Sequence, residues 1–183
     1  MAYSDAIKKS IHGDEYYSPQ NVVDMIVPYV LRCGYSKIWC PFDKAESKFV
    51  TTFQDLGLDV TYGHIETGQD FFQFDKPQGE IVVSNPPFSK RDAIFEKLFQ
   101  WGMPFALVMN FNGLFDSKKR GKLFREYGVE MLVPYGRMRF IQKDDGIKNS
   151  PNFQSVYVCN KLLKDQIVFS DAIFGKEQKN DKE

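Results

Sequence analysis

Apolar and polar positions alternate with two different periods along the chain, and the changes of period mark the predicted elements. Helical spacing of apolar residues is found in residues 19–33, 45–56, 94–99 and 115–127. Short apolar or alternating runs predict strands at 37–43, 58–62, 81–83, 104–110, 129–134, 152–160 and 166–169. Strands that alternate with helices in this way predict an α/β fold with parallel strand pairs and right-handed crossovers.

The first predicted helix has start and stop signals of its own. Ser18 is a suitable N-cap and Pro19 a suitable first helical residue. Cys33 and Gly34 are expected to end the helix, and Pro28 inside it predicts a kink or a break.

The sharpest local feature is a short β-branched run at 81–83 that leads into Asn85, Pro86, Pro87 and Phe88. Two consecutive prolines cannot donate hydrogen bonds to a neighbouring strand, so strand pairing must stop there. The prolines also hold Asn85 and Phe88 on a stiff, extended edge. A polar and aromatic tip between a buried strand and a helix is where open α/β sheets bind ligands.

Composition places the chain among globular proteins. The 183 residues are 43% hydrophobic and 15% aromatic, which excludes wholesale disorder. The simplest division is one domain over residues 16–174, with an N-terminal arm at 1–15 and a charged tail at 175–183.

Cysteine usage and hydropathy indicate a cytoplasmic protein. The chain has no apolar run of membrane-spanning length, and its first residues lack the apolar core of a signal peptide. Its 3 cysteines form no Cys-x-x-Cys pair and it has only 2 histidines, so a structural zinc site is not expected.

Charge is unevenly distributed although the formal net charge is zero. Residues 1–80 hold 7 Lys and Arg against 12 Asp and Glu, whereas residues 81–183 hold 17 against 12. An acidic half and a basic half suit a domain that binds a cationic cofactor on one side and a polyanion on the other. Solvated helix and loop faces are the alternative explanation.

The tip Asn85-Pro86-Pro87-Phe88 resembles the catalytic motif Asp/Asn/Ser-Pro-Pro-Tyr/Phe/Trp of the S-adenosylmethionine-dependent amino-methyltransferases. The resemblance implies that the Asn85 side-chain oxygen and the Pro86 carbonyl accept hydrogen bonds from an exocyclic amine, while Phe88 stacks on the target base. Positioning and electrostatics would then supply most of the rate. An ordinary Pro-Pro turn at the end of a strand is the alternative.

Two further segments resemble cofactor-binding motifs of the same family. Tyr17-Ser18-Pro19 is similar to the Tyr/Phe-Thr-Pro entry that lies beside the methionine part of the cofactor. Asp70 and Phe71 are similar to a Gly-Asp-Phe segment in which the carboxylate accepts from the adenine amino group and the aromatic ring packs on the base. A plain N-cap and a surface turn are the respective alternatives.

The chain departs from the family pattern around the cofactor loops. Pro41, Phe42, Asp43 and Lys44 stand where the family has a Gly-rich acidic loop, and the Gly-x-Gly is missing. The resemblance still implies that Pro41 lies beside the cofactor and that Asp43 meets its ammonium group. His64 stands nearest the place of the acid that binds the ribose.

A C-terminal pattern is similar to that of small phage-type DNA adenine-N6 methyltransferases, which have Gly-Arg-x-x-Phe, a polar loop and an aromatic-x-Ser. It implies that Arg137, Arg139, Asn149 and Ser155 contact phosphates or the flipped-out base. Ordinary hairpin residues are the competing account.

Together these motifs predict a Rossmann-like class I methyltransferase. It should have a mixed seven-stranded sheet with helices on both faces and an antiparallel strand at 152–160. S-adenosyl-L-methionine is the expected cofactor and adenine N6 in DNA the expected target. Because the chain is short for a separate recognition domain, a second copy or a recognition subunit is an expected partner.

Three other functions stay open at this point. RNA methylation at adenine N6 or guanine N2 uses similar motifs, and so does methylation of a protein glutamine. A non-catalytic nucleic-acid-binding subunit that has lost cofactor binding would explain the missing Gly-x-Gly.

Overall fold

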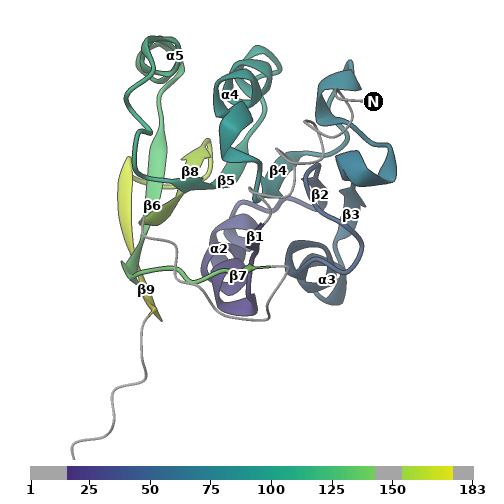
Figure 1. The fold of residues 1–183 in the computed structure, drawn as a ribbon. Helices are drawn as coiled ribbons and strands as arrows, with labels where there is room; N and C mark the ends of the chain where they lie inside the picture. The colour runs from purple at the N-terminus through teal and green to yellow at the C-terminus, as the bar shows by residue number, and fades with distance from the viewer. Residues whose placement is uncertain (1–15, 143–153, 175–183) are drawn as a thin grey trace, which may run out of the picture.

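A seven-stranded mixed sheet lies at the centre of the protein (Figure 1). The computed structural model describes residues 16–142 and 154–174, so the predicted arm and tail lie outside the described residues. In sheet order β3-β2-β4-β5-β8-β6-β9, the strands are β3 (Asp59–Tyr62), β2 (Lys37–Cys40), β4 (Ile81–Ser84), β5 (Phe105–Asn110), β8 (Ser155–Asn160), β6 (Glu130–Gly136) and β9 (Ile167–Phe174). No helix in these ranges is long and apolar enough to cross a membrane.

Strand directions confirm the predicted mixed sheet. Strands β3, β2, β4 and β5 run parallel to one another, and β8 runs antiparallel to both β5 and β6. The antiparallel strand is the one predicted at 152–160. The short strand predicted at 166–169 is longer than expected, because its pairing with β6 resumes after an irregularity between Val133 and Tyr135. Pro134 lies at that irregularity and has no backbone N–H to donate.

Helices cover both faces of the sheet (Figure 1), as predicted. One face carries α2 (Gln20–Arg32) and α3 (Lys48–Asp55), and the other carries α4 (Arg91–Gln100) and α5 (Lys118–Tyr127). Each face has its own apolar cluster. In β4, Ile81 and Val83 join the α2–α3 cluster while Val82 joins the α4–α5 cluster, so this strand is buried on both faces.

The start of α2 differs from the sequence-based expectation. Pro19, with φ −71° and ψ 165°, is the N-cap, no side chain caps the helix, and Gln20 is the first helical residue. Ser18 is therefore not the N-cap. The extended ψ of Pro19 places Ser18 one residue too early for its hydroxyl to reach the first free N–H groups of the helix.

Pro28 does not break α2, which runs without interruption to Arg32. The proline removes the N–H that would have bonded the carbonyl of Asp24. Both residues are solvent-exposed, so water can satisfy that carbonyl.

Helix α3 begins three residues later than predicted, because Ser47 caps it. The Ser47 hydroxyl accepts a hydrogen bond from the Phe49 N–H at 3.2 Å. The residues before it form a turn that follows β2.

A two-stranded ribbon joins segments that are far apart in the sequence. Strand β1 (Tyr16–Tyr17) pairs antiparallel with β7 (Ile141–Gln142). The entry to α2 therefore lies beside the segment that follows β6.

Candidate active site

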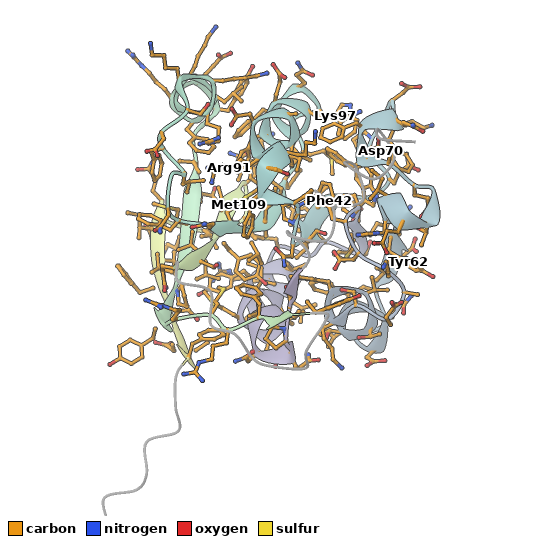
Figure 2. All side chains as sticks on the ribbon, viewed as in Figure 1. Phe42, Tyr62, Asp70, Arg91, Lys97 and Met109 are labelled. Atoms are coloured by element: carbon orange, nitrogen blue, oxygen red, sulfur yellow. The ribbon has the colours of Figure 1, made fainter. Side chains whose placement is uncertain are left out.

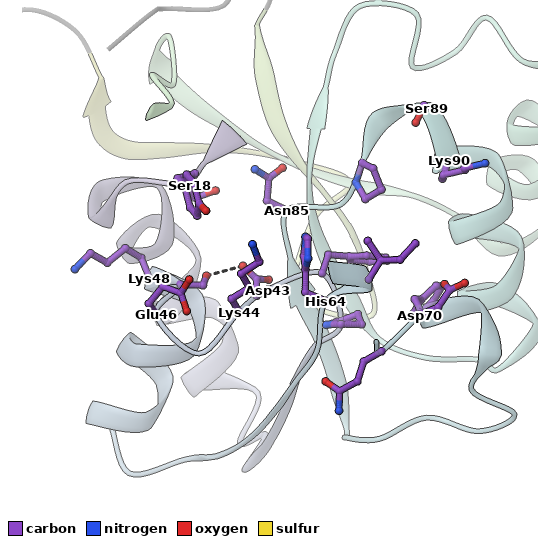
Figure 3. Close-up of a pocket in the computed structure, with 18 of the residues that line it drawn as sticks. Ser18, Asp43, Lys44, Glu46, Lys48, His64, Asp70, Asn85, Ser89 and Lys90 are labelled. Atoms are coloured by element: carbon purple, nitrogen blue, oxygen red, sulfur yellow. Dashed lines mark hydrogen bonds between the residues drawn. The ribbon is translucent and has the colours of Figure 1, made fainter. Parts of the chain in front are cut away.

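The sheet has a topological switch point between β2 and β4. From β2 the chain crosses through α3 to β3 on one side, and β4 pairs on the other side. The carboxyl ends of two such strands border a crevice in which open α/β sheets bind ligands. A cavity of about 740 Å³ lies here, lined from before α2, after β2, around two 3₁₀ helices and after β4 (Figure 3). The two short helices are η1 (Ile65–Thr67) and η2 (Phe71–Gln73).

This cavity brings together every residue that the sequence analysis assigned to the cofactor. They are Tyr17, Ser18, Pro19, Pro41, Asp43, His64, Asp70 and Phe71. From the Asn-Pro-Pro-Phe tip, Asn85 and Pro87 line the same cavity. In the view of Figure 3, Asn85 and His64 lie between Ser18 and Asp70. Segments up to about 70 residues apart along the chain thus converge on one site.

Asp43 is the buried acid of the site. Its carboxylate accepts hydrogen bonds from the Ser47 hydroxyl at 2.5 Å and from the Ser84 hydroxyl. Burial raises the pKa of Asp43 to about 6, and the two hydroxyl donors hold that pKa below the value that burial alone would produce. Asp43 thereby links the N-terminus of α3 to the end of β4, one residue before Asn85.

An aromatic cluster forms the wall of the cavity around Phe71. The Phe71 ring is only 3% exposed, and its centroid lies 4.9 Å from Phe42, 5.5 Å from Trp39 and 5.3 Å from Phe72. Phe42 is half-buried and Phe72 is exposed, and both also line the cavity. A planar ligand would therefore meet more ring surface on Phe42 and Phe72 than on Phe71 itself.

Two polar residues of the site cap the 3₁₀ helices. Asp70 accepts a hydrogen bond from the Phe72 N–H at 2.9 Å at the start of η2. His64 accepts through Nδ1 from the Glu66 N–H at 3.1 Å at the start of η1. Lys44 forms an ion pair with Glu66, which ties the turn after β2 to η1.

The Ser18 hydroxyl is buried and has no hydrogen-bond partner among the described residues. Ser18 also lines the cavity. A buried hydroxyl without a partner costs free energy, so a polar ligand group at this wall would relieve that cost.

Phe88 begins a third 3₁₀ helix, η3 (Phe88–Lys90), and lines a second hollow of about 380 Å³. Phe88, Arg91 and Arg120 are among its lining residues, and it shares Ser89, Lys90 and Ala93 with the first cavity. Pro86 is buried at the base of the tip and lines neither space. The two hollows therefore meet at η3.

The described residues among those assigned to the substrate line neither hollow. Arg137 is exposed and Arg139 half-buried after β6, and Ser155 is fully buried at the start of β8. Ser155 pairs with Asn110, so it is at the same edge of the sheet as the site. Asn149 lies outside the described residues.

Sequence reasoning missed several residues that line the main cavity. They are Gln20, Phe42, Lys44, Glu46, Ser47, Lys48, Ile65, Gln69, Phe72, Ser89, Lys90 and Ala93. Most directly follow or precede an assigned residue, so proximity along the chain was the available signal. The missed residues without an assigned neighbour are Glu46, Ser47, Lys48, Lys90 and Ala93, whose positions depend on how α3 and α4 pack.

Comparison with known proteins identifies the architecture. No family model matches the sequence, and no curated protein matches it. The methyltransferase subunit of a type I restriction-modification system from Streptococcus thermophilus superposes with a TM-score of 0.50 and 15% identity, over 85% of this chain and 47% of that one. A modification subunit of a putative type I restriction enzyme from Vibrio vulnificus YJ016 also has a TM-score of 0.50, with 12% identity, over 86% and 47%.

The chain has a Rossmann-like methyltransferase fold. At these identities the likeness concerns the fold alone, and the chain spans less than half the length of either subunit. Within this methyltransferase fold, the cavity at the switch point lies where the fold's ligand crevice is expected.

Proposed function

We propose that this protein is an S-adenosylmethionine-dependent methyltransferase that acts on an exocyclic amine, and that its target is adenine N6 in DNA. The observation that carries the proposal is the convergence of two independent sets of residues. Asn85 and Pro87 of the Asn-Pro-Pro-Phe tip line the same cavity as the residues assigned to the cofactor.

The residues of the cavity fit an adenosyl-sulfonium cofactor. The carboxylates of Asp43 and Asp70 suit its ammonium and amino groups, and the rings of Phe42 and Phe72 suit its adenine. The unpartnered Ser18 hydroxyl provides a further polar contact at the wall. A cavity of about 740 Å³ lies within the range of cofactor sites.

The chemistry required of the protein is modest. When bound, the cofactor supplies a methyl group on a positively charged sulfur. Asn85 and the Pro86 carbonyl would accept hydrogen bonds from the target NH₂, whose lone pair is otherwise delocalised into the ring. These bonds would direct the lone pair toward the methyl group, while Phe88 would hold the base plane. The N–C bond would form as the S–C bond breaks, and one amine proton would then pass to water. Positioning therefore replaces general-base catalysis.

Charge and fold both support a nucleic-acid substrate. Helix α5 carries the exposed basic residues Lys118, Lys119, Lys122 and Arg125. Basic residues of this kind suit phosphate contacts. The two solved structures that share the fold are subunits of a type I restriction-modification system and of a putative type I restriction enzyme, and we take this as support for DNA over RNA or protein. A second copy of the chain or a recognition subunit would then supply sequence selectivity.

Two measurements in series test the proposal. Isothermal titration calorimetry with S-adenosylmethionine comes first, and absence of binding at millimolar cofactor would favour a non-catalytic subunit. Tritiated methyl transfer is then offered in parallel to duplex DNA, single-stranded DNA, tRNA, rRNA and protein, followed by digestion to nucleosides. We expect N6-methyladenine from DNA. Label found only in RNA or in protein glutamine would contradict the DNA assignment.

The variant Asn85→Ala separates chemistry from cofactor binding. We expect it to abolish methyl transfer while the calorimetric affinity for S-adenosylmethionine stays within about threefold. Asn21→Ala is the matched control, because Asn21 is exposed on α2 and lines neither hollow. Full activity of Asn85→Ala would refute the role of the tip.

A further inference from the structure

The surface beyond Phe88 combines exposed aromatic rings with cations. Phe111 and Phe115 are 43% and 51% exposed, and their ring centroids lie 6.2 Å apart at 75°. They belong to the loop of residues 111–117 that joins β5 to α5. Because β4 and β5 are parallel neighbours, this loop and the Asn-Pro-Pro-Phe tip leave the sheet at the same edge.

Several hydrogen bonds hold this loop in place. Arg120 is only 4% exposed and donates from Nε to the Leu114 carbonyl at 2.8 Å and from Nη2 to the Gly113 carbonyl at 2.6 Å. The Phe111 N–H donates to the Gln154 carbonyl at 2.8 Å. The two exposed rings are therefore presented by an ordered backbone rather than a loose one.

Asp92 connects the same loop to the helix that follows the tip. Its carboxylate accepts from the Ser117 hydroxyl at 2.8 Å and pairs with Arg120. Arg91, on the side of α4 toward α5 in Figure 2, donates to the Asn112 carbonyl at 3.3 Å. Hydrogen bonds from Arg91 and Arg120, two residues that line the second hollow, thus tie the loop of residues 111–117 to η3 and the start of α4.

The charge of this surface is positive. Lys90, Arg91 and Arg120 line the hollow, and Asp92 is the carboxylate that lines it. Asp92 is engaged by Arg120, and Asp116 on the loop lies near Arg91 and offsets part of its charge. Lys90 is exposed and forms no ion pair among the described residues. Lys90 is therefore the group best placed to meet an anion.

We propose that this surface, namely η3 and the loop of residues 111–117, binds the nucleotide next to the target base in an unpaired form. Phe111 and Phe115 stack on that base, and Lys90 contacts its phosphodiester. The inference rests on the proposed function and adds to it the form of the substrate. Exposed aromatic rings beside a cation are what single-stranded nucleic-acid sites use, because every unpaired base offers a ring face. A base in a closed duplex could not reach either ring.

Binding of oligonucleotides without cofactor tests the inference directly. Fluorescence anisotropy is measured with a labelled single-stranded DNA 12-mer containing one adenine, and with the same sequence as a closed duplex. We expect the single strand to bind at least tenfold more tightly. The double variant Phe111→Ala/Phe115→Ala should raise its Kd at least tenfold. Lys90→Ala should raise the Kd for the single strand about threefold. It should also reduce the slope of log Kd against log salt concentration by about one, the value expected for the loss of one phosphate contact.

Matched controls keep the test specific to this surface. Phe169→Ala removes a ring that is 76% exposed on β9, and Lys164→Ala removes an exposed lysine before β9. Both should bind the single strand like the wild type. The inference is overturned if the wild type binds no oligonucleotide, if it prefers the duplex, or if the double variant binds unchanged with an unaltered circular dichroism spectrum.

The outcomes separate this inference from the proposed function. Binding through Phe111 and Phe115 without any methyl transfer would retain the surface and reject the enzyme. Methyl transfer to DNA with the same kcat/KM in the double variant would retain the enzyme and reject the surface.

Discussion

The Ser84 hydroxyl donates a hydrogen bond to the buried carboxylate of Asp43 and so joins the carboxyl ends of β4 and β2. Ser84 directly precedes Asn85, and Asp43 also accepts from Ser47, which caps α3. One carboxylate therefore positions the candidate catalytic tip relative to the turn after β2. This turn has no Gly-x-Gly, and hydrogen bonds from the Ser47 and Ser84 side chains hold Asp43 within it.

The raised pKa of Asp43 makes folding stability depend on pH. The folded protein holds this proton up to a pKa of about 6, whereas an unfolded Asp titrates near 3.9. Between these values the folded state binds more protons, so its stability falls as pH rises through about 4 to 6. We expect Asp43→Asn to remove this contribution. Relative to wild type, the free energy of unfolding of the variant should rise by about 2 kcal/mol between pH 4 and pH 7, measured by urea unfolding.

A second variant checks the cause of this pH dependence. Ser84→Ala removes a donor that lowers the pKa of Asp43, so the stability loss should extend to higher pH than in the wild type. A stability difference between Asp43→Asn and wild type that stays constant from pH 4 to 7 would contradict the assignment.

Asp70 is expected to contribute charge to cofactor binding and not only local structure. Asp70→Asn keeps an oxygen that can cap η2 through the Phe72 N–H but removes the negative charge. Because hydrogen bonds to a charged group are stronger, the calorimetric Kd for S-adenosylmethionine should rise about tenfold or more. The free energy of unfolding should stay the same as in the wild type. Asp75→Asn, at an exposed position outside the cavity, is the control. Equal affinities in both variants would mean that Asp70 is only a cap.

Neighbouring basic residues of α5 should differ sharply in their effect on stability. Arg120 is buried and bonds two carbonyls and Asp92, whereas Lys119 forms an exposed ion pair with Glu96 at 2.7 Å. Arg120→Lys keeps the charge but loses the planar fork, so we expect a loss of about 1–3 kcal/mol in urea unfolding. Lys119→Ala should change stability by less than about 1 kcal/mol. Similar losses for both would argue against the anchoring role of Arg120.

Elements that lie within one stretch of sequence were predictable, because periodicity reports local burial. The uninterrupted run at 81–83 is a central strand, and the residues around Ile94 form the buried face of α4. Arg120 could not be found in this way, since four of the five residues at 118–122 are basic and such a segment resembles a solvated helix face. Its burial depends on carbonyls in a loop whose course only the tertiary structure determines.

The candidate site shows the same division between local and long-range information. Motif order along the chain located Asp70 and Asn85, and the parallel topology explains why both line one cavity. The aromatic surface around Phe71 was not predictable in detail, because it depends on Phe42 and Trp39 from β2 and the turn after it. The extension of β9 beyond residue 169 was missed because Ser170 and Asp171 interrupt the apolar pattern, while backbone pairing with β6 continues.

Substituting alanine at two glycines, Gly136 and Gly121, should change the stability of the protein in opposite directions. Gly136 ends β6 with φ +95°, and a Cβ there would lie 1.9 Å from the Phe174 carbonyl oxygen. Gly136→Ala should therefore cost about 2 kcal/mol or more and separate the ends of β6 and β9. Gly121 lies inside α5 with nothing within 4 Å of an added Cβ, so Gly121→Ala should stabilise by about 0.5–1 kcal/mol. Thermal and urea unfolding measure both, and a tolerated Gly136→Ala would show that β9 does not pair with β6 at that point.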